Sequence, residues 1–379
     1  MSENTLWYLP LEQLDERYTN ALYDHTIDDL NEAGVNYEVV HGETLTTEVE
    51  TGQVLDAESR NYYAMSQVQK LLKKVKQGEV TDGDVVFNQD FWHIGMSSLQ
   101  YLADIREWDI NLYGFVCAGS FEEWDFVNLQ GMTPWAKHLE SMWGEIYDGL
   151  FVANERMRDM VKERVSNPSK IHVTGLPLSQ EWIYERVEPV PTEEKEDIVV
   201  FPHRWDEEKC PYLFNRLADE FADEDVRFVH TTGRTGSIGN GEEPSDNVEV
   251  IRNPDGKKQY YEILAKSKVI FSAALQDTVG NAMFEAINLG NTPVVPEGQY
   301  DEYIPPEFRY KRYDRYEAKE MIEYYLQDEN HKQVPEITKR YNHSTEGREI
   351  PNTLRGHGEV QEPSNPCRKG AYQNAGCRT

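Results

Sequence analysis

Apolar residues in the first half of the chain fall into short runs that alternate with longer amphipathic segments. The short runs predict strands at 6–11, 36–42, 84–89, 110–119, 148–154 and 170–175. The longer segments predict helices at 13–33, 59–77, 97–105, 134–147 and 155–165. Two of these helices are followed by Gly34 and Gly78, and glycine readily adopts the left-handed conformation that ends a helix. Strands that alternate with helices indicate a mostly parallel sheet in a doubly wound fold.

The same alternation resumes after residues 184–197, a stretch with prolines and many acids that indicates a linker between domains. Beyond it, strands are predicted at 197–202, 226–233, 247–251, in the apolar run from 269, and at 292–296. Helices are predicted at 209–221, 257–267, 279–289 and 316–327. We therefore expect an α/β protein with two Rossmann-like domains, residues 1–183 and 198–342, that face a cleft. Residues 343–379 are polar and without periodicity, which predicts a disordered tail.

Composition narrows the class of protein. A length of 379 residues suffices for two domains, and no apolar run is long enough to span a membrane. The N-terminus shows no secretory signal, and the four cysteines form no CxxC pair, which favours reduced thiols in a cytoplasm, that of the host if the protein is viral. A net charge of −30 argues against broad affinity for nucleic acids. A local basic groove remains possible at Lys70–Lys76, 156–164 or 309–315, although each segment also suits a solvated surface.

The segment 269–296 reads as a strand, a loop, a helix and a second strand. Backbone N–H groups at the start of the helix, at Val279, Gly280 and Asn281, favour an anion, and Gly280 lets that anion approach closely. Asp277, on the loop, has the chemistry to hold the hydroxyl groups of a sugar, and Glu285 that to accept hydrogen bonds from a ribose. The alternatives are a helix cap for Asp277 and a surface or half-buried acid for Glu285. The segment 269–296 is therefore suited to binding a nucleotide-activated donor, as in a sugar-transfer enzyme.

A second candidate site follows the strand that ends at Phe201. His203, Arg204 and Lys209 lie at the carboxyl end of that strand, where ligands bind in open α/β sheets. Arg204 and Lys209 have the charges to clamp a diphosphate. The alternative is that Arg204 pairs at the surface with Glu207 or Glu208.

Two motifs, PHRWDEEK at 202–209 and VGNAMFEAINLGNTPVVP at 279–296, resemble the glycosyltransferase-like domain family that includes the tRNA-queuosine mannosyltransferase. The likeness covers about residues 198–328 and implies a retaining GT-B glycosyltransferase that needs no metal. It implies that Arg204 and Lys209 bind the diphosphate of a UDP- or GDP-sugar, that Glu285 binds the ribose and that Asp277 contacts the sugar. The family has Glu where this chain has Asp277, so the donor sugar stays open.

Short patches of the N-terminal half, at 10–19, 89–95 and 117–140, resemble glycosyltransferases of tailed phages, some of which modify hydroxymethylated bases in viral DNA. This likeness implies a DNA acceptor. Cys117 stands where many GT-B enzymes have a histidine that touches the donor sugar, and His93 is a substitute for it, unless it is a packed histidine. Arg17 is a candidate phosphate contact or an exposed helix residue. The loops expected to receive the acceptor carry Asp90, Trp92, Glu122, Trp124 and Asp125.

Other motifs carry less weight. Asp82 and Asp84 form a DxD sequence, but they precede a strand in a turn, where aspartate and glycine are expected without a metal. The glycine-rich segment 233–241 fits neither a P-loop nor a dinucleotide fingerprint. The favoured function is sugar transfer to a modified DNA base. The alternatives are a tRNA or surface-glycan acceptor, an inactive GT-B protein that binds nucleic acid, and a sugar-nucleotide epimerase.

Overall fold

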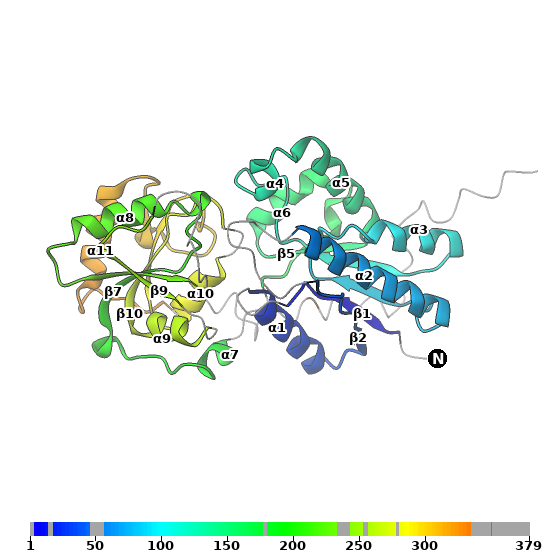
Figure 1. Ribbon diagram of the computed structural model, residues 1–379, viewed down its shortest axis with the longest axis horizontal. Helices are drawn as coiled ribbons and strands as arrows, with labels where there is room; N and C mark the ends of the chain where they lie inside the picture. Colours follow the sequence, from blue (N-terminus) through cyan, green and yellow to red (C-terminus); the bar gives the residue numbers. More distant parts are fainter. Residues whose placement is uncertain are drawn as a thin grey trace, which may run out of the picture.

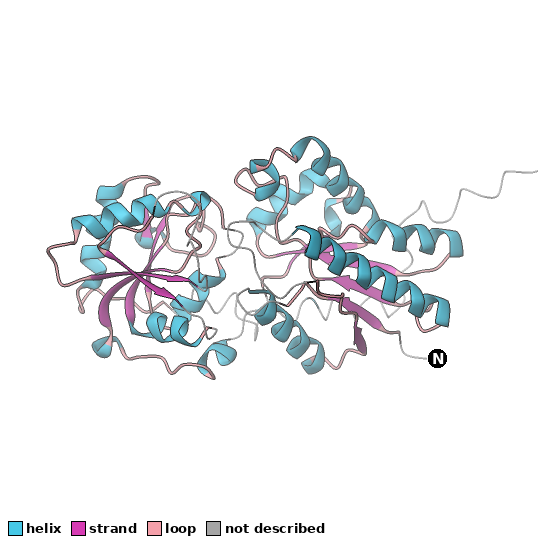
Figure 2. Ribbon diagram, in the orientation of Figure 1, coloured by secondary structure: helices cyan, strands magenta, loops and turns pink. Residues whose placement is uncertain are grey.

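The computed structural model describes residues 4–13, 18–45, 57–176, 180–232, 243–252, 257–277, 280–334 and 350. These residues form two lobes, each built on a parallel sheet of six strands with helices packed against it (Figures 1 and 2). The predicted α/β fold with two Rossmann-like domains is therefore confirmed. Among the described residues, no helix is both long enough and apolar enough to cross a lipid bilayer.

The N-terminal sheet has the strand order β2-β1-β3-β4-β5-β6. Its strands are β1 Leu6–Leu9, β2 Tyr37–Val39, β3 Val85–Asn88, β4 Asn111–Phe115, β5 Gly149–Val152 and β6 Ile171–Val173. Its helices are α1 Tyr18–Glu32, α2 Ala57–Gln77, α3 Met96–Arg106, α4 Phe126–Leu129, α5 Thr133–Ile146 and α6 Glu155–Val161. All four residues of β1, β3 and β5 are buried, because helices cover both faces of a parallel sheet.

The C-terminal sheet has the order β12-β11-β10-β7-β8-β9. Its strands are β7 Glu196–Phe201, β8 Arg227–Thr232, β9 Val248–Arg252, β10 Ser267–Phe271, β11 Thr292–Pro296 and β12 Arg309–Tyr310. Its helices are α8 Pro211–Glu220, α9 Lys258–Lys266, α10 Asn281–Asn288 and α11 Arg315–Leu326, and α7 Gln180–Tyr184 precedes this sheet in the chain. The chain runs from β7 outward to β9 and then returns to β10 on the other side of β7. The strand order therefore reverses between β7 and β10, which is where ligands bind in such sheets.

Several bounds and short elements differ from the sequence-based expectations. The strand expected at 110–119 ends at Phe115, and the helix expected at 279–289 spans Asn281–Asn288. The linker expected at 184–197 already contains the start of β7 at Glu196. Three short elements, α4, α7 and the two-residue strand β12, were not predicted, because such short segments carry no measurable periodicity. The glycine-rich segment 233–241 and the tail from 343, apart from Ile350, lie outside the described residues.

The two lobes touch at the carboxyl ends of their sheets. Glu302, in the loop after β11, accepts hydrogen bonds from the backbone N–H groups of Glu155 and Arg156, which begin α6 after β5. A second contact involves α7, where the Trp182 ring lies between His25 of α1 and Tyr261 of α9, with ring centroids 5.2 and 6.1 Å away. The loops at the carboxyl ends of β11 and β5 thus meet between the two domains.

Candidate active site

Asp277 lies at the point where the C-terminal sheet reverses its strand order. It follows β10, and the residues facing it come from the loop after the neighbouring strand β7. Lys209 Nζ lies 3.7 Å from Asp277 Oδ1, and His203 Nδ1 lies 3.8 Å from Oδ2. The three residues lie close together because loops at the carboxyl ends of adjacent parallel strands share one edge of the sheet.

The carboxylate of Asp277 is held in its charged form. Its side chain is 18% exposed. Burial acts to raise the pKa of this carboxyl group, but Lys209, His203 and a hydrogen bond from Tyr300 together lower the pKa below its ordinary value. The Tyr300 hydroxyl donates to Asp277 Oδ2 over 3.0 Å, and the Gln299 amide donates to the Asp277 carbonyl. Asp277 is therefore a fixed acceptor, suited to hydroxyl groups.

His203 is a buried, neutral imidazole beside this carboxylate. Burial lowers the pKa of His203 to about 4, although the nearby Asp277 acts in the opposite direction. The ring stacks edge-on against Phe201, with centroids 5.1 Å apart. Within the described part of the chain, His203 Nε2 is buried and has no hydrogen-bond partner. A buried nitrogen of this kind is costly unless a ligand or water satisfies it.

The two predicted cations differ in environment. Lys209, at the end of the short 3-10 helix Glu207–Lys209, is buried and also donates to the carbonyl of Gln276. The Arg204 side chain is 50% exposed, and it pairs with Glu208 at 2.7 Å and with Asp206 at 3.1 Å. The surface ion pair considered as an alternative for Arg204 is thus present. It also keeps the guanidinium at the rim of the site, where its charge still acts on Asp277.

The start of α10 lies against Asp277. Gly280, the residue before the helix, has φ +79°, a left-handed conformation that favours glycine. A Cβ atom at Gly280 would lie 3.0 Å from the Tyr300 ring and 3.3 Å from Asp277 Oδ2, so only glycine leaves this side open. Among the described residues no side-chain cap of this helix is seen, and Asn281 is half-buried as its first residue. Backbone N–H groups at this end therefore remain suited to an anion. Val279 lies outside the described residues.

Glu285, one turn into α10, is almost fully buried and has three hydrogen-bond donors around it. Its Oε1 accepts from Lys257 Nζ and from the Tyr261 hydroxyl, both over 2.8 Å, and its Oε2 accepts from the Tyr260 hydroxyl over 2.6 Å. Glu285 is thus neither a surface acid nor a half-buried one but a buried acid with three partners. Its role in binding a ribose stays a prediction.

His93 lies in the N-terminal domain, where both ring nitrogens are engaged. Nδ1 accepts from the backbone N–H of Gly95 over 3.2 Å, so Nε2 is the donor to Gln67 Oε1, also over 3.2 Å. Burial lowers the pKa of His93 to about 4, with a smaller effect from Arg60. These contacts account for His93 as a packed residue, and its contact with a donor sugar stays a prediction. Arg17 lies outside the described residues.

The loops expected to receive the acceptor are held by internal contacts. Glu122 is buried and forms a bidentate pair with Arg156 at 3.0 and 3.2 Å. Asp125 caps α4 by accepting from Val127 N, and burial raises the pKa of Asp125 to about 6. Trp92 donates from Nε1 to the buried Glu140. The loop after β4 is therefore a rigid surface that adjoins the start of α6.

The DxD sequence has a structural role. Asp84 accepts from the backbone of Thr5, from the indole of Trp7 and from the backbone of Thr81. The described residues contain no cluster of three or more potential metal ligands. Cys117 and Cys210 are not in disulfides.

Sequence reasoning missed the residues that hold the two acids. Tyr300 and Gln299 reach Asp277 from the loop after β11, while Lys257, Tyr260 and Tyr261 reach Glu285 from α9. No motif marks these residues, and only the packing of distant elements brings them to the site.

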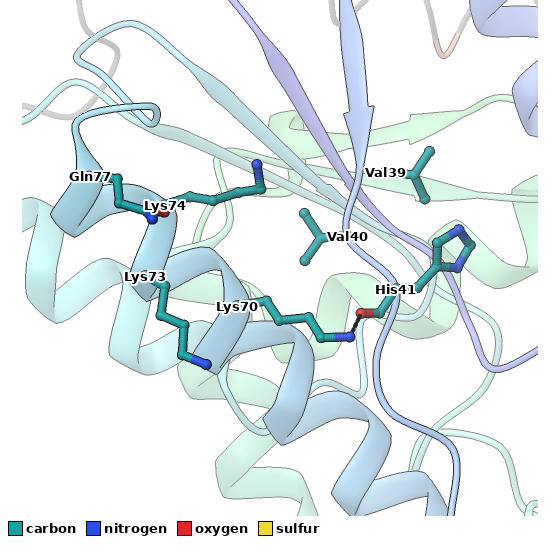
Figure 3. Close-up of a pocket in the computed structure, with 7 residues that line it drawn as sticks. All are labelled: Val39, Val40, His41, Lys70, Lys73, Lys74 and Gln77. Atoms are coloured by element: carbon teal, nitrogen blue, oxygen red, sulfur yellow. Dashed lines mark hydrogen bonds between the residues drawn. The ribbon is translucent and has the colours of Figure 1, made fainter.

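A separate basic pocket lies on the N-terminal domain, between α2 and the end of β2 (Figure 3). Its volume is about 410 Å³. It is lined by Val39, Val40, His41, Lys70, Lys73, Lys74 and Gln77. Lys70 donates to the His41 carbonyl over 2.8 Å, and Lys74 pairs with Glu38 and Glu79. The segment Lys70–Lys76, which the sequence suggested as a basic groove, thus contributes one wall of this pocket.

The fold is shared with several solved enzymes, although no protein-family model matches the chain. Sucrose-phosphate synthase from Thermosynechococcus elongatus superimposes with a TM-score of 0.68 at 11% identity, covering 93% of this chain and 98% of that one. An α,α-trehalose-phosphate synthase from Burkholderia vietnamiensis gives 0.64 at 10% identity, with coverages of 94% and 99%. Anabaena HepE, solved with UDP-glucose, gives 0.60 at 11% identity, with coverages of 93% and 99%.

Identities this low show a shared fold alone, so the likenesses to the queuosine mannosyltransferase family and to phage enzymes stay predictions. The agreement nevertheless extends over both domains of each neighbour. Together with the two parallel six-stranded sheets, it shows that this chain has the GT-B fold of the glycosyltransferases it resembles.

Proposed function

We propose that the protein transfers a sugar from a nucleoside diphosphate sugar to an acceptor hydroxyl group, with retention and without a required metal. The observation that carries the proposal is the group around Asp277, in which a fixed carboxylate, the buried cation Lys209 and the start of α10 lie together at the strand-order reversal, with Arg204 at the rim. A carboxylate suits the hydroxyl groups of a sugar. Cations and helix N–H groups suit a diphosphate.

The demanding step is the departure of the nucleoside diphosphate, on which negative charge develops. Lys209, Arg204 and the N-terminus of α10 lie where they would stabilise that charge. Glu285 would bind the ribose after exchanging one of its present donors for a ribose hydroxyl. UDP-sugars are the first donors to test, because Anabaena HepE was solved with UDP-glucose, and GDP-sugars are the second.

The favoured acceptor is a hydroxymethylated base in viral DNA, with the reaction in the cytoplasm of the host. Two observations support it. The N-terminal patches resemble phage glycosyltransferases, and the pocket of Lys70, Lys73 and Lys74 supplies a local positive surface in a chain of net charge −30. Such a surface is what a phosphate backbone needs.

The decisive experiment incubates the protein with UDP- and GDP-sugars and with DNA that contains hydroxymethylated pyrimidines. The DNA is then digested to nucleosides, and their masses are measured by mass spectrometry. A mass gain of one hexose or pentose is expected. Gain on tRNA or on a glycan instead would keep the transferase and replace the acceptor. Donor turnover without any acceptor would indicate an epimerase or hydrolase, and absence of donor binding would leave an inactive nucleic-acid-binding protein.

A further inference from the structure

The loop 298–304, called here the coupling loop, contacts both the donor-site acid and the opposite domain. On one side, Tyr300 is fully buried, and its hydroxyl contacts Asp277 Oδ2 and Ser272 Oγ, each over 3.0 Å. On the other side, two residues later, Glu302 reaches the N-terminal domain. One short segment therefore carries contacts to both domains.

The contact of Glu302 is specific. Its Oε1 accepts from Glu155 N over 3.0 Å, and its Oε2 accepts from Arg156 N over 3.2 Å. The next N–H of α6, that of Met157, is already capped by the Asn154 side chain. The N–H of Met157 is thus capped from within the N-terminal domain, whereas the first two N–H groups of α6 are capped by Glu302 of the C-terminal domain. A carboxylate at a helix N-terminus is also favoured by the helix dipole.

The coupling loop is rigid enough to transmit this contact. Backbone N–H groups of Tyr303 and Ile304 donate to the Tyr300 carbonyl over 3.2 and 2.9 Å. The Arg309 side chain donates to the carbonyls of Asp301 and Ile304. Because these bonds fix Tyr300 relative to Glu302, a shift of Glu302 moves the hydroxyl that holds Asp277.

The contact extends to the acceptor side. Arg156, whose N–H binds Glu302, holds the buried Glu122 with its guanidinium. Glu122 belongs to the loop after β4 expected to face the acceptor. A continuous set of hydrogen bonds therefore joins that loop, the start of α6, the coupling loop and Asp277.

We propose that Glu302 is a positioning residue that ties the docking of the two domains to the placement of Asp277. The proposal rests on the proposed sugar transfer. No contact of Glu302 with Arg204, Lys209 or Glu285 is seen among the described residues, so affinity for the nucleoside diphosphate itself should not depend on Glu302. Transfer should depend on it, because misplacing a reacting group by about 1 Å costs up to roughly 100-fold in rate.

The test compares Glu302→Ala and the milder Glu302→Gln with Glu297→Ala, which removes an exposed carboxylate five residues earlier. In Glu302→Ala we expect the Kd of the nucleoside diphosphate product within about twofold of wild type, kcat for transfer lower by roughly 10-fold or more, and a larger share of donor lost to hydrolysis. Glu302→Gln should be intermediate, and Glu297→Ala should match wild type. Wild-type kcat in Glu302→Ala, or a parallel loss of nucleoside diphosphate affinity, would overturn the proposal.

A second readout needs no activity. Small-angle X-ray scattering should give a larger radius of gyration for Glu302→Ala than for wild type and for Glu297→Ala, with an unchanged circular dichroism spectrum. If wild type transfers no sugar, the proposed function fails, and scattering alone then decides whether Glu302 docks the domains. Identical scattering curves for the three proteins would refute the docking role.

Discussion

Asp277 shows how a single residue depends on its surroundings. Its carboxylate lies among Lys209, His203 and Tyr300, which together outweigh the cost of burial and keep it ionised. Arg204 lies farther out, paired with Asp206 and Glu208. Lys209 is therefore a fixed part of the site, and Arg204 is the cation able to reorient toward a bound diphosphate.

Arg204→Ala should lower sugar transfer by about 100-fold or more, the usual cost of losing one group that stabilises developing negative charge. Steady-state transfer at saturating donor measures this effect. The matched control is Arg227→Ala, since Arg227 is also about half exposed and pairs with two carboxylates, but begins β8 at the opposite end of the same sheet. The control should be near wild type in activity. Near-normal turnover of Arg204→Ala would contradict a role of Arg204 in stabilising the departing diphosphate.

Helix α2 shows what an element contributes. It carries Arg60, Lys70, Lys73, Lys74 and Lys76 against a single acid, Glu58, in a protein with 68 acidic and 38 basic residues. Lys70, Lys73 and Lys74 line one side of the pocket, and the Lys70 side chain reaches the His41 carbonyl (Figure 3). The element thus concentrates positive charge that the composition of the whole chain conceals.

Replacing Lys70 and Lys73 together by Gln should weaken binding of double-stranded DNA about 10-fold at moderate salt and reduce the salt dependence of log K by about two. Fluorescence anisotropy at several salt concentrations measures both quantities. Lys258→Glu on α9, where the side chain is 77% exposed, is the control. An equal loss of affinity in the control would show that DNA does not use the pocket, and UDP binding should be unchanged in all variants.

At the scale of the whole molecule, buried histidines make the stability of the fold depend on pH. Burial lowers the pKa of His93, His203 and His331 to about 4 each, against about 6.5 in an unfolded chain. Between these two values the unfolded state binds more protons than the folded state. Stability from these groups is therefore fully present above pH 6.5 and is lost as the pH falls from 6.5 toward 4.

Lowering the pH from 7 to 5 should reduce the free energy of unfolding by roughly 2 kcal/mol per histidine. Urea unfolding followed by fluorescence at both pH values measures the change. In His93→Gln the decrease in the free energy of unfolding between pH 7 and pH 5 should be smaller by the contribution of one histidine, roughly 2 kcal/mol. This difference should hold whatever the stability of the variant at pH 7. A free energy of unfolding that stays level across this range would contradict the buried, neutral state.

Most of the fold could be predicted from the sequence, because buried strands and amphipathic helices each require a characteristic spacing of apolar residues along the chain. β3 and α8, for example, lie where the apolar pattern placed them. The linker, α7 and β12 did not follow, since their ends depend on partners elsewhere. At the site, the sequence indicated that chemistry lies in the loops at the carboxyl edge of a parallel sheet, but the adjacency of His203, Lys209 and Asp277 also needed β7 and β10 to be neighbours, which the structure supplied.

The sequence by itself thus determined the two-domain α/β fold and the loops that carry the candidate cations and acids, because the periodicity of apolar residues is a local property. Only the tertiary structure decided what holds those acids. Tyr300 on Asp277, two tyrosines and Lys257 on Glu285, and Glu302 on the start of α6 are contacts between residues far apart in the chain. No local pattern encodes such contacts, since they arise from how whole elements pack.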